Sequence, residues 1–398
     1  MITNQRACQI LADLVQIPSV NNEEKRVAEV LANLFQEYDI PAKVISHDEK
    51  RANLVAEVGS GQPVLVVTGH LDVVDPGDRT KWKTNPFQLT EKNQILYGRG
   101  VSDMKSGLAA LAIALINFHE KFPTNHGTVR FLATYGEEIG ENGSHDFYHD
   151  GYMQDATALL VAEPSAGYIS NAEKGSLDLK LTSRGKAAHS SFPDLGFNAI
   201  DPLLDILVAA NQQLRSPELP QNDTLGSVTI NNNLIKGGVQ INSLPDEATA
   251  GINIRTIPEF TGADAIKKIQ AIIAHRSVVK NNNTDIMLSQ LVPKNPNKPL
   301  IDLEVLMDEP AVIAPADSSL IKLAQTIGER ISGKTIPIKP CPGITDASNL
   351  MRHKPADFPF LIFGPGNGSS HMPNEQIPKR VYLNFIKIYT ELFNQYFS

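Results

Sequence analysis

Residues 64–75, VLVVTGHLDVVD, decide the fold. The short apolar run Val64–Thr68 is closed at once by Gly69, and this pattern predicts a strand that is buried on both faces. The side chains that follow such a strand lie at the carboxyl edge of a sheet, where open α/β folds bind ligands. His70 and Asp72 are two residues apart and point the same way along an extended chain, so we expect Asp72 to hydrogen-bond the far side of the imidazole or of a neighbouring ligand. Taken alone, His70 also fits a purely structural role.

The composition describes a folded, acidic chain. Its 398 residues are 41% hydrophobic and carry a formal net charge of -8, which allows two domains with separate cores and argues against a nucleic-acid partner. The two cysteines, Cys8 and Cys341, cannot build a disulfide framework or a thiolate zinc site. The N-terminal segment lacks a signal-peptide pattern, and the longest apolar run, residues 108–116, is too short to cross a bilayer. We therefore expect a cytoplasmic protein with no membrane partner.

Further carboxylates follow other predicted strands. The segment 98–107, GRGVSDMKSG, lacks the GxGxxG spacing of a dinucleotide site and predicts a tight loop that presents Asp103 just before a helix. Two later strands are predicted to end in Glu137–Glu138 and in Glu163. Two adjacent ionised glutamates are costly to bury without a cation, and in isolation they favour a solvated turn.

The sequence pattern changes after Lys174. Strand-like segments alternate with two helical segments, which indicates a small α+β domain inserted into the first domain. The first domain is then expected to resume and to run through a strand and a turn to His371 before a closing helix. We therefore predict an α/β domain, a mixed sheet flanked by helices, over 1–173 and 308–398, with the inserted domain over 174–307.

Five side chains fall at the ends of strands or in loops of one predicted sheet: His70, Asp103, Glu138, Glu163 and His371. Imidazole nitrogens and carboxylate oxygens without thiolates suit zinc or a similar divalent ion, and this set suffices for two ions that share one carboxylate. A metal also accounts for the paired glutamates, because coordination neutralises Glu138 and leaves Glu137 free as a base. The pattern therefore indicates metal-assisted hydrolysis.

The motifs GHLDVV, GRGVSDMKSG, GEE, Glu163–Pro164 and HMPNE, in this order, resemble the dinuclear zinc M20 peptidase and deacylase family over nearly the whole chain. That family includes acetylornithine deacetylase, succinyl-diaminopimelate desuccinylase, carboxypeptidase G and aminoacylase. The resemblance implies a zinc-exopeptidase-like catalytic domain with an inserted lid and dimerisation domain, and therefore a homodimer. It also implies two divalent metal ions per subunit, with Zn2+ expected and Co2+ or Mn2+ as alternatives.

The resemblance also implies roles for single residues. One ion is implied to bind His70, Asp103 and Glu163, and the other Asp103, Glu138 and His371. Asp103 would then bridge the two ions, Glu137 would be the general base, and Asp72 would orient His70. The peptide bond after the bridging aspartate is often cis in the family, so we expect a cis bond between Asp103 and Met104.

The inserted domain resembles the family lid. The element GKAAHSS, residues 185–191, resembles one whose histidine reaches the active site of the partner subunit, which implies that His189 stabilises an oxyanion there. The alternative is a histidine in a surface loop. The resemblance implies substrate contacts at Lys174, Asn242, Arg255, Gly343 and Thr345. The guanidinium of Arg255 fits a carboxylate bidentately, and an ion pair on the strand surface is the alternative.

Segments such as RANLVAEVGSGQPVL, GHLDVVDPGD and IFGPGN resemble the Gram-positive type of succinyl-diaminopimelate desuccinylase. This implies a small N-acyl amino acid as substrate, and hydrolysis of N-succinyl-LL-2,6-diaminoheptanedioate in lysine biosynthesis. Two departures from the desuccinylase pattern leave the selectivity for a substrate with three carboxylates open. Lys174 stands where better-known desuccinylases have an arginine, and Ile344 replaces a threonine in the substrate loop. The alternatives are an acetylornithine deacetylase, a broader N-acyl-amino-acid hydrolase or dipeptidase, and, in another class, a non-catalytic metal-binding homologue.

Overall fold

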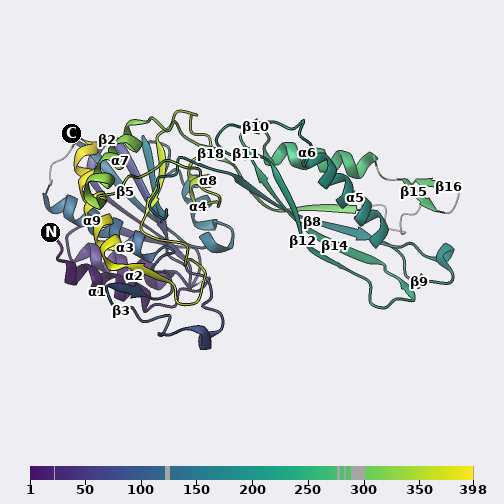
Figure 1. The fold of residues 1–398 in the computed structure, drawn as a ribbon, viewed down its shortest axis with the longest axis horizontal. Helices are drawn as coiled ribbons and strands as arrows, with labels where there is room; N and C mark the ends of the chain where they lie inside the picture. The colour runs from purple at the N-terminus through teal and green to yellow at the C-terminus, as the bar shows by residue number, and fades with distance from the viewer. Residues whose placement is uncertain (22, 122–125, 276–277, 282–283, 288–300, 398) are drawn as a thin grey trace. The chain divides into compact units, whose positions relative to one another are not determined.

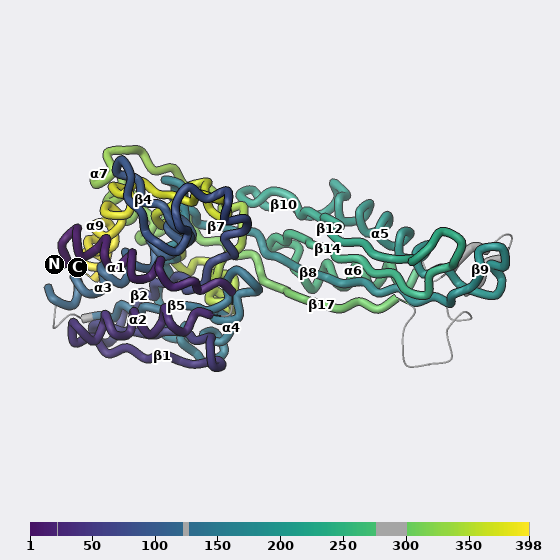
Figure 2. The backbone as a smooth tube through the Cα atoms, turned by 90° about the horizontal axis from the view of Figure 1, so that it is seen from below, coloured from purple at the N-terminus to yellow at the C-terminus, as the bar shows by residue number. Residues whose placement is uncertain are grey.

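The computed structural model describes residues 1–21, 23–121, 126–275, 278–281, 284–287 and 301–397. The chain divides into two compact units, one formed by Met1–Glu173 with Ile313–Ser398 and the other by Lys174–Val312. The colours of Figures 1 and 2 show the first unit built from both ends of the chain. The predicted return at residue 308 falls inside strand β17 (Ile301–Glu309), which pairs with β8 (Gly175–Arg184), so the second boundary comes after that strand. Among the described residues, no helix is both long and apolar enough for a membrane span.

The first unit is a mixed sheet surrounded by helices (Figure 1). The strand order is β1-β2-β6-β19, with β5 paired to β2. The strands are β1 (Ala42–Ser46), β2 (Ala52–His70), β5 (His126–Thr134), β6 (Ala158–Pro164) and β19 (Phe360–Gly364). The helices are α1 (Asn4–Val15), α2 (Lys25–Gln36), α3 (Lys105–Lys121), α4 (Asn142–His149), α7 (Ser319–Ser332), α8 (Ala347–Leu350) and α9 (Lys379–Tyr396). Shorter elements are η1 (Arg79–Lys81), β3 (Thr90–Lys92), β4 (Ile95–Tyr97), η2 (Glu137–Ile139), β7 (Ala172–Glu173), β18 (Val312–Ile313) and β20 (Gln376–Pro378).

Strand β2 reverses direction within its length. Residues 54–60 run opposite to β5 and residues 64–70 run alongside it, so both halves pair with the same strand. The reversal needs glycine, because Gly59 has a φ of +94° and a Cβ there would lie 2.1 Å from the carbonyl oxygen of Gly127. This turn directs the second half of β2 toward the sheet edge where His70 lies.

Helix α3 is the central helix of this unit. Its residues from Lys105 to Phe118 are all buried, as expected for a helix that is apolar on every side. At Gly107 the helix comes so close to β6 that a Cβ would lie 2.2 Å from the carbonyl oxygen of Ala162. This close approach brings Asp103, just before α3, near Glu163 at the end of β6.

The second unit is an antiparallel sheet of order β12-β14-β8-β17. Along β14 buried residues alternate with more exposed ones, which is the pattern of a sheet covered on one face. The helices are α5 (Ile200–Leu214) and α6 (Gly262–His275). The remaining elements are β9 (Ala188–His189), η3 (Pro193–Leu195), β10 (Gln221–Asn222), β11 (Gly226–Ser227), β12 (Thr229–Gly237), β13 (Ser243–Leu244), β14 (Glu247–Thr256), β15 (Val278–Asn281) and β16 (Thr284–Met287).

Two glycines in the turn of β2 allow the packing argument to be tested with a pair of matched substitutions. Gly59→Ala should destabilise the first unit by about 1–3 kcal/mol more than Gly61→Ala, because both residues have positive φ but only Gly59 faces backbone atoms at contact distance. Urea unfolding followed by the fluorescence of Trp82, the single tryptophan, measures the difference within this unit. Equal midpoints for the two variants would contradict the packing argument.

Candidate active site

The carboxyl edge of the first unit's sheet gathers a histidine and two carboxylates. His70 lies at the end of β2 and is 1% exposed, Asp103 precedes α3, and Glu163 lies near the end of β6. The Nε2 atom of His70 is 3.2 Å from Asp103 Oδ1 and 3.5 Å from Glu163 Oε1. Parallel pairing of β2 with β6 puts these strand ends at the same edge.

A second group shares Asp103 with the first. His371 follows β19 on a loop, and its Nε2 atom is 3.4 Å from Asp103 Oδ2 and 3.0 Å from Glu138 Oε2. The two oxygens of Asp103 therefore face different histidines. The structure thus brings the five sequence-predicted ligands together in two groups that meet at one carboxylate.

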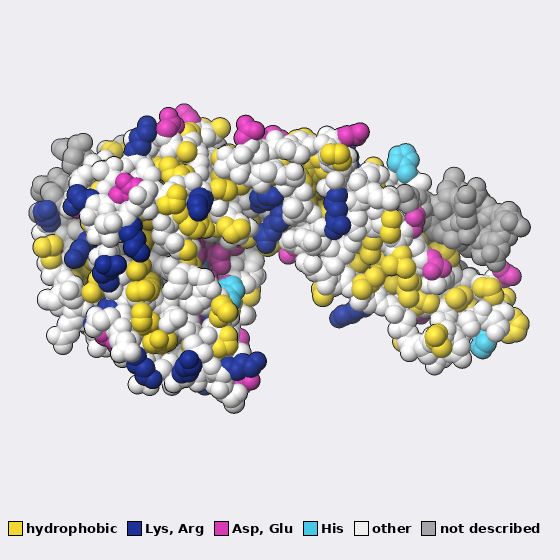
Figure 3. All heavy atoms as spheres, viewed as in Figure 1, with side chains coloured by type: hydrophobic (Ala, Val, Ile, Leu, Met, Phe, Trp, Pro, Cys, Tyr) yellow, Lys and Arg dark blue, Asp and Glu magenta, His cyan; other side chains and the backbone are white. Residues whose placement is uncertain are grey.

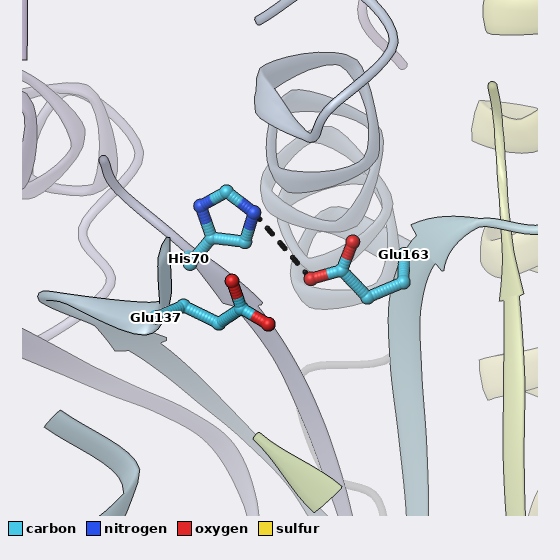
Figure 4. Close-up of side chains that lie close together, drawn as sticks. All are labelled: His70, Glu137 and Glu163. Atoms are coloured by element: carbon cyan, nitrogen blue, oxygen red, sulfur yellow. Dashed lines mark ion pairs between the residues drawn. The ribbon is translucent and has the colours of Figure 1, made fainter. Parts of the chain in front are cut away.

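Glu137 lies beside the first group. Figure 4 shows its carboxylate next to His70, and the carboxylate of Glu163 directed at the imidazole. One candidate ligand atom each from His70, Glu137 and Glu163 lie within 4.8 Å of one another, and the same holds for His70, Asp103 and Glu138. Glu137 therefore lies within ligand distance of His70 and Glu163.

Asp72 has a wider role than the sequence indicated. The Nδ1 atom of His70 is 3.0 Å from the backbone oxygen of Asp72 and 3.4 Å from its carboxylate, so the carbonyl is the closer partner of the imidazole. The buried carboxylate accepts hydrogen bonds at 3.2 Å from the backbone N–H groups of Glu137 and Glu138. Asp72 therefore holds both the histidine and the turn that carries the glutamate pair.

The carboxylates shift one another's protonation. Burial raises the pKa of Glu137 and of Glu163 well above the ordinary value for glutamate. Burial alone would lower the pKa of His70, but the nearby carboxylates outweigh it and raise this pKa. Hydrogen bonds to Asp103 and Glu138 raise the pKa of His371 to about 10. The cluster is therefore suited to accept positive charge, whether as protons or as a metal ion.

A pocket opens over this cluster within the first unit. It has a volume of about 180 Å³, and Figure 3 shows acidic and histidine side chains gathered on this face of the unit. It is lined by Asp103, Glu137, Glu138, Glu163, Pro164, Ser165, Tyr168, Ser170, Cys341, Ile344, Thr345, Ile362 and His371. The polar residues Ser165, Tyr168 and Ser170 were not assigned from the sequence, because no motif marks them and only the folding of the chain after β6 brings them to the pocket.

The predicted substrate loop only partly reaches this pocket. Ile344 and Thr345 line it, whereas Gly343 is not among the lining residues. The Thr345 hydroxyl donates a hydrogen bond of 3.0 Å to the buried carboxylate of Glu173. Thr345 thus also anchors its own loop.

The other predicted substrate residues lie in the second unit, in two separate places. Lys174 donates a hydrogen bond to the backbone of Ser227, and burial and nearby Arg255 lower its pKa. Exposed His189 lies on β9, and the backbone N–H of the next residue, Ser190, donates a hydrogen bond to the Asn242 carbonyl.

These two places are at opposite ends of the second unit's sheet. Arg255 pairs with Ser176 at one end of β8, and Arg184 pairs with Glu247 at the other, so strands of ten residues separate them, a span of roughly 30 Å. Figure 2 shows β9 beyond one end of this sheet.

The peptide bond between Asp103 and Met104 is cis, so this prediction is confirmed.

Comparison with known proteins identifies the family to which the chain belongs. The family model described as "Peptidase family M20/M25/M40" matches residues 66–395. Proteins named "Probable succinyl-diaminopimelate desuccinylase" are similar over their full length: that of Staphylococcus epidermidis (strain ATCC 12228) is 33% identical, covering 100% of this chain and 99% of the relative, and that of Staphylococcus aureus (strain MRSA252) is 37% identical, covering 98% and 97%. The acetylornithine deacetylase of Buchnera aphidicola is 28% identical, covering 98% and 97%.

Solved structures share the fold. The M20 metallo-carboxypeptidase Sso-CP2 of Sulfolobus solfataricus superposes with a TM-score of 0.76 at 19% identity, covering 98% of this chain and 99% of the other. A Bacillus subtilis protein described as a dinuclear metal binding peptidase of the M20 family gives 0.69 at 15% identity, covering 99% and 98%. Together with the family match and the full-length relatives, these findings show that the chain belongs to peptidase family M20/M25/M40 and is a hydrolase acting on amide bonds.

Proposed function

We propose that this hydrolase is a metal-dependent succinyl-diaminopimelate desuccinylase, which releases succinate from N-succinyl-LL-2,6-diaminoheptanedioate in cytoplasmic lysine and diaminopimelate biosynthesis. The observation that carries the chemistry is the position of Asp103, whose two carboxylate oxygens face His70 and His371 at 3.2 and 3.4 Å. The names of the full-length relatives support the choice of substrate.

The donor set fits two divalent ions. Two ligand atoms bound to one tetrahedral zinc ion at about 2.0–2.2 Å lie roughly 3.3–3.6 Å apart. The contacts of His70 with Asp103 and Glu163, at 3.2 and 3.5 Å, are close to that spacing. In this proposal His70, Asp103 and Glu163 would hold one ion, and Asp103, Glu138 and His371 would hold the other. Zn2+ suits these nitrogen and oxygen donors, and Co2+ and Mn2+ are alternatives. When bound, such ions lower the pKa of a water and polarise the scissile carbonyl.

The chain's own residues then move the proton. Glu137 takes a proton from the attacking water and returns it to the leaving nitrogen, and burial raises its pKa, which makes it a stronger base than an exposed glutamate. Glu138 contacts His371, whereas Glu137 lies within ligand distance of His70 and Glu163. Asp72 keeps Glu137 in place through the backbone.

In this proposal the substrate is recognised by the positively charged side chains of Lys174 and Arg255 in the second unit and by the loop that contains Gly343 and Thr345. The proposed substrate has three carboxylates, and Lys174 and Arg255 lie close enough for Arg255 to lower the pKa of Lys174 in addition to burial. The Nη1 atom of Arg255 is buried and makes no hydrogen bond within the described part of the chain. A substrate carboxylate would satisfy this donor.

Acetylornithine deacetylase is the second candidate. Lys174 supports this candidate, because a lysine lacks the bidentate fork with which an arginine binds a carboxylate. The similar Buchnera protein is also named an acetylornithine deacetylase. Acetylornithine has one carboxylate, whereas the succinyl substrate has three. The two activities therefore need different contacts from the positively charged side chains of Lys174 and Arg255.

The substrate assignment predicts a ranking. With Zn2+- or Co2+-loaded enzyme, kcat/KM should be highest for N-succinyl-LL-diaminopimelate, lower for acetylornithine and lowest for a dipeptide panel. Arg255→Lys should reduce kcat/KM for the succinyl substrate more than for acetylornithine, because the fork is lost while the charge remains. A higher kcat/KM for acetylornithine than for the succinyl substrate would replace the desuccinylase proposal with the second candidate.

The base assignment predicts loss of turnover without loss of metal. Glu137→Gln should lower kcat about 10²–10⁴-fold, because general-base transfer is removed while the proposed ligands remain. Metal content by elemental analysis should stay at the wild-type value, and Glu163→Gln, which alters a proposed ligand, serves as the control with reduced content. Near-normal kcat in Glu137→Gln would assign the base elsewhere.

The second unit has a surface that could pair with a second copy of the chain. Its edge strand β12 exposes Leu234 and Ile235 by 64% and 58%, and neighbouring α5 exposes Leu204 and Val208 by 44% and 52%. An edge strand beside exposed apolar side chains is suited to a partner surface, so we propose a homodimer through this unit. A small substrate cannot span from Arg255 to His189 along one sheet, so His189 and Asn242 would serve the partner subunit.

A mixing experiment tests the shared site. Chains carrying His189→Ala and Glu137→Ala, each inactive alone, should regain about a quarter of wild-type activity after co-refolding, because half of the dimers are mixed and each has one complete site. A chain with both substitutions, mixed with Glu137→Ala, is the inactive control. No recovery, with dimers formed, would exclude action of His189 across subunits.

A further inference from the structure

One buried carboxylate outside the proposed ligand set contacts the loop that presents Asp103. Glu375 is fully buried, and its Oε1 atom accepts hydrogen bonds from the backbone N–H groups of Ser102 at 2.7 Å and Asp103 at 3.0 Å. Its Oε2 atom accepts from Gly100 N–H at 3.0 Å and from Arg99 Nη1 at 2.6 Å. Four donors from residues 99–103 thus converge on a single side chain.

Glu375 belongs to the loop that also carries His371. The backbone of that loop is unusual, since His371 and Asn374 both have a φ of +63°, which non-glycine residues seldom adopt. A second link joins the same two loops, because the Asn367 N–H donates to the Ser102 hydroxyl at 3.0 Å. A loop held in this conformation needs contacts of this kind to stay in place.

We propose that Glu375 is a positioning residue that sets Asp103 opposite His371 and thereby determines the geometry between them. The proposal rests on the proposed function, in which Asp103 and His371 hold the same ion. His371 and Glu375 are joined by a short stretch of chain, so a carboxylate bound to the Asp103 backbone fixes the distance between two ligands from distant parts of the sequence. A residue that supports a ligand in this way commonly changes metal affinity ten- to a hundredfold when altered.

The charge of Glu375 is needed for this role. A carboxylate has two acceptor oxygens, and both are used, whereas a glutamine amide keeps one acceptor and adds a donor that would face N–H groups. The guanidinium of Arg99 balances the buried charge, and it lies 5.2 Å from the ring centre of Trp82. Trp82 therefore reports on the same cluster by fluorescence.

The test compares Glu375→Gln with Glu173→Gln in the full-length protein. Glu173 is a buried glutamate of the same unit that accepts hydrogen bonds from the hydroxyl groups of Thr345 and Ser348, so it controls for the replacement of a buried, hydrogen-bonded glutamate by glutamine. Co2+ is titrated into apoprotein and the binding is followed by the visible absorption of the bound ion with a competing chelator. Glu375→Gln should weaken the binding of one Co2+ ion ten- to a hundredfold and shift the Trp82 emission. Glu173→Gln should leave the Co2+ affinities at the wild-type values.

The outcomes separate the two proposals. Wild-type affinity for both Co2+ ions in Glu375→Gln would overturn the positioning role and leave the proposed function intact. Failure of the wild-type protein to bind two ions would instead count against the proposed function. If Glu375→Gln does not fold, Glu375→Asp provides the measurement, since it keeps the charge beside Arg99 but draws the carboxylate back from the Asp103 N–H. It should show the same loss of affinity, and an unchanged affinity would overturn the role.

Discussion

Repulsion among acidic side chains is the constraint on which the first unit depends. Asp103, Glu137, Glu138 and Glu163 meet at one sheet edge with two histidines between them, and their burial is unfavourable while all are ionised. The pKa values of Glu137, Glu163 and His371 are all raised, which means that the cluster favours the protonated form of each group and so an added positive charge. In the proposed function a pair of divalent cations would supply this positive charge and would allow the cluster to act in hydrolysis.

The surrounding structure holds this cluster with buried carboxylates that bind backbone N–H groups. Asp72 binds those of Glu137 and Glu138, and Glu375 binds those of Ser102 and Asp103. In each case a side chain from one part of the sequence fixes the backbone of another, so the reactive groups are positioned by rigid segments rather than by their own rotamers. Such support is what keeps a metal site within the narrow range of geometry that chemistry needs.

The two units contribute different groups of residues to the proposed function. The first unit contains every proposed metal ligand and the proposed base, and the residues that line the described pocket all belong to this unit. The second unit contributes Lys174, Arg255, Asn242 and His189, which are proposed to recognise the substrate and the partner subunit. Because the inserted unit is a separate compact body, the proposed recognition residues could vary without changing the proposed metal ligands, which fits relatives with names as different as metallo-carboxypeptidase and acetylornithine deacetylase.

The sequence by itself determined the family, the mixed α/β class and the identity of the residues that meet at the sheet edge. These follow from local signals: an apolar strand closed by a glycine, and short motifs whose residue types suit metal and proton chemistry. Only the tertiary structure decided that the oxygens of Asp103 face different histidines, that the Asp72 carboxylate binds the 137–138 backbone, that Glu375 holds the Asp103 loop, and that Tyr168 and Ser170 line the pocket. The boundary after β17 also required the structure, because strand pairing with β8 sets it. These features depend on which side chains and backbone groups meet after distant segments pack, and neither periodicity nor motif spacing contains that information.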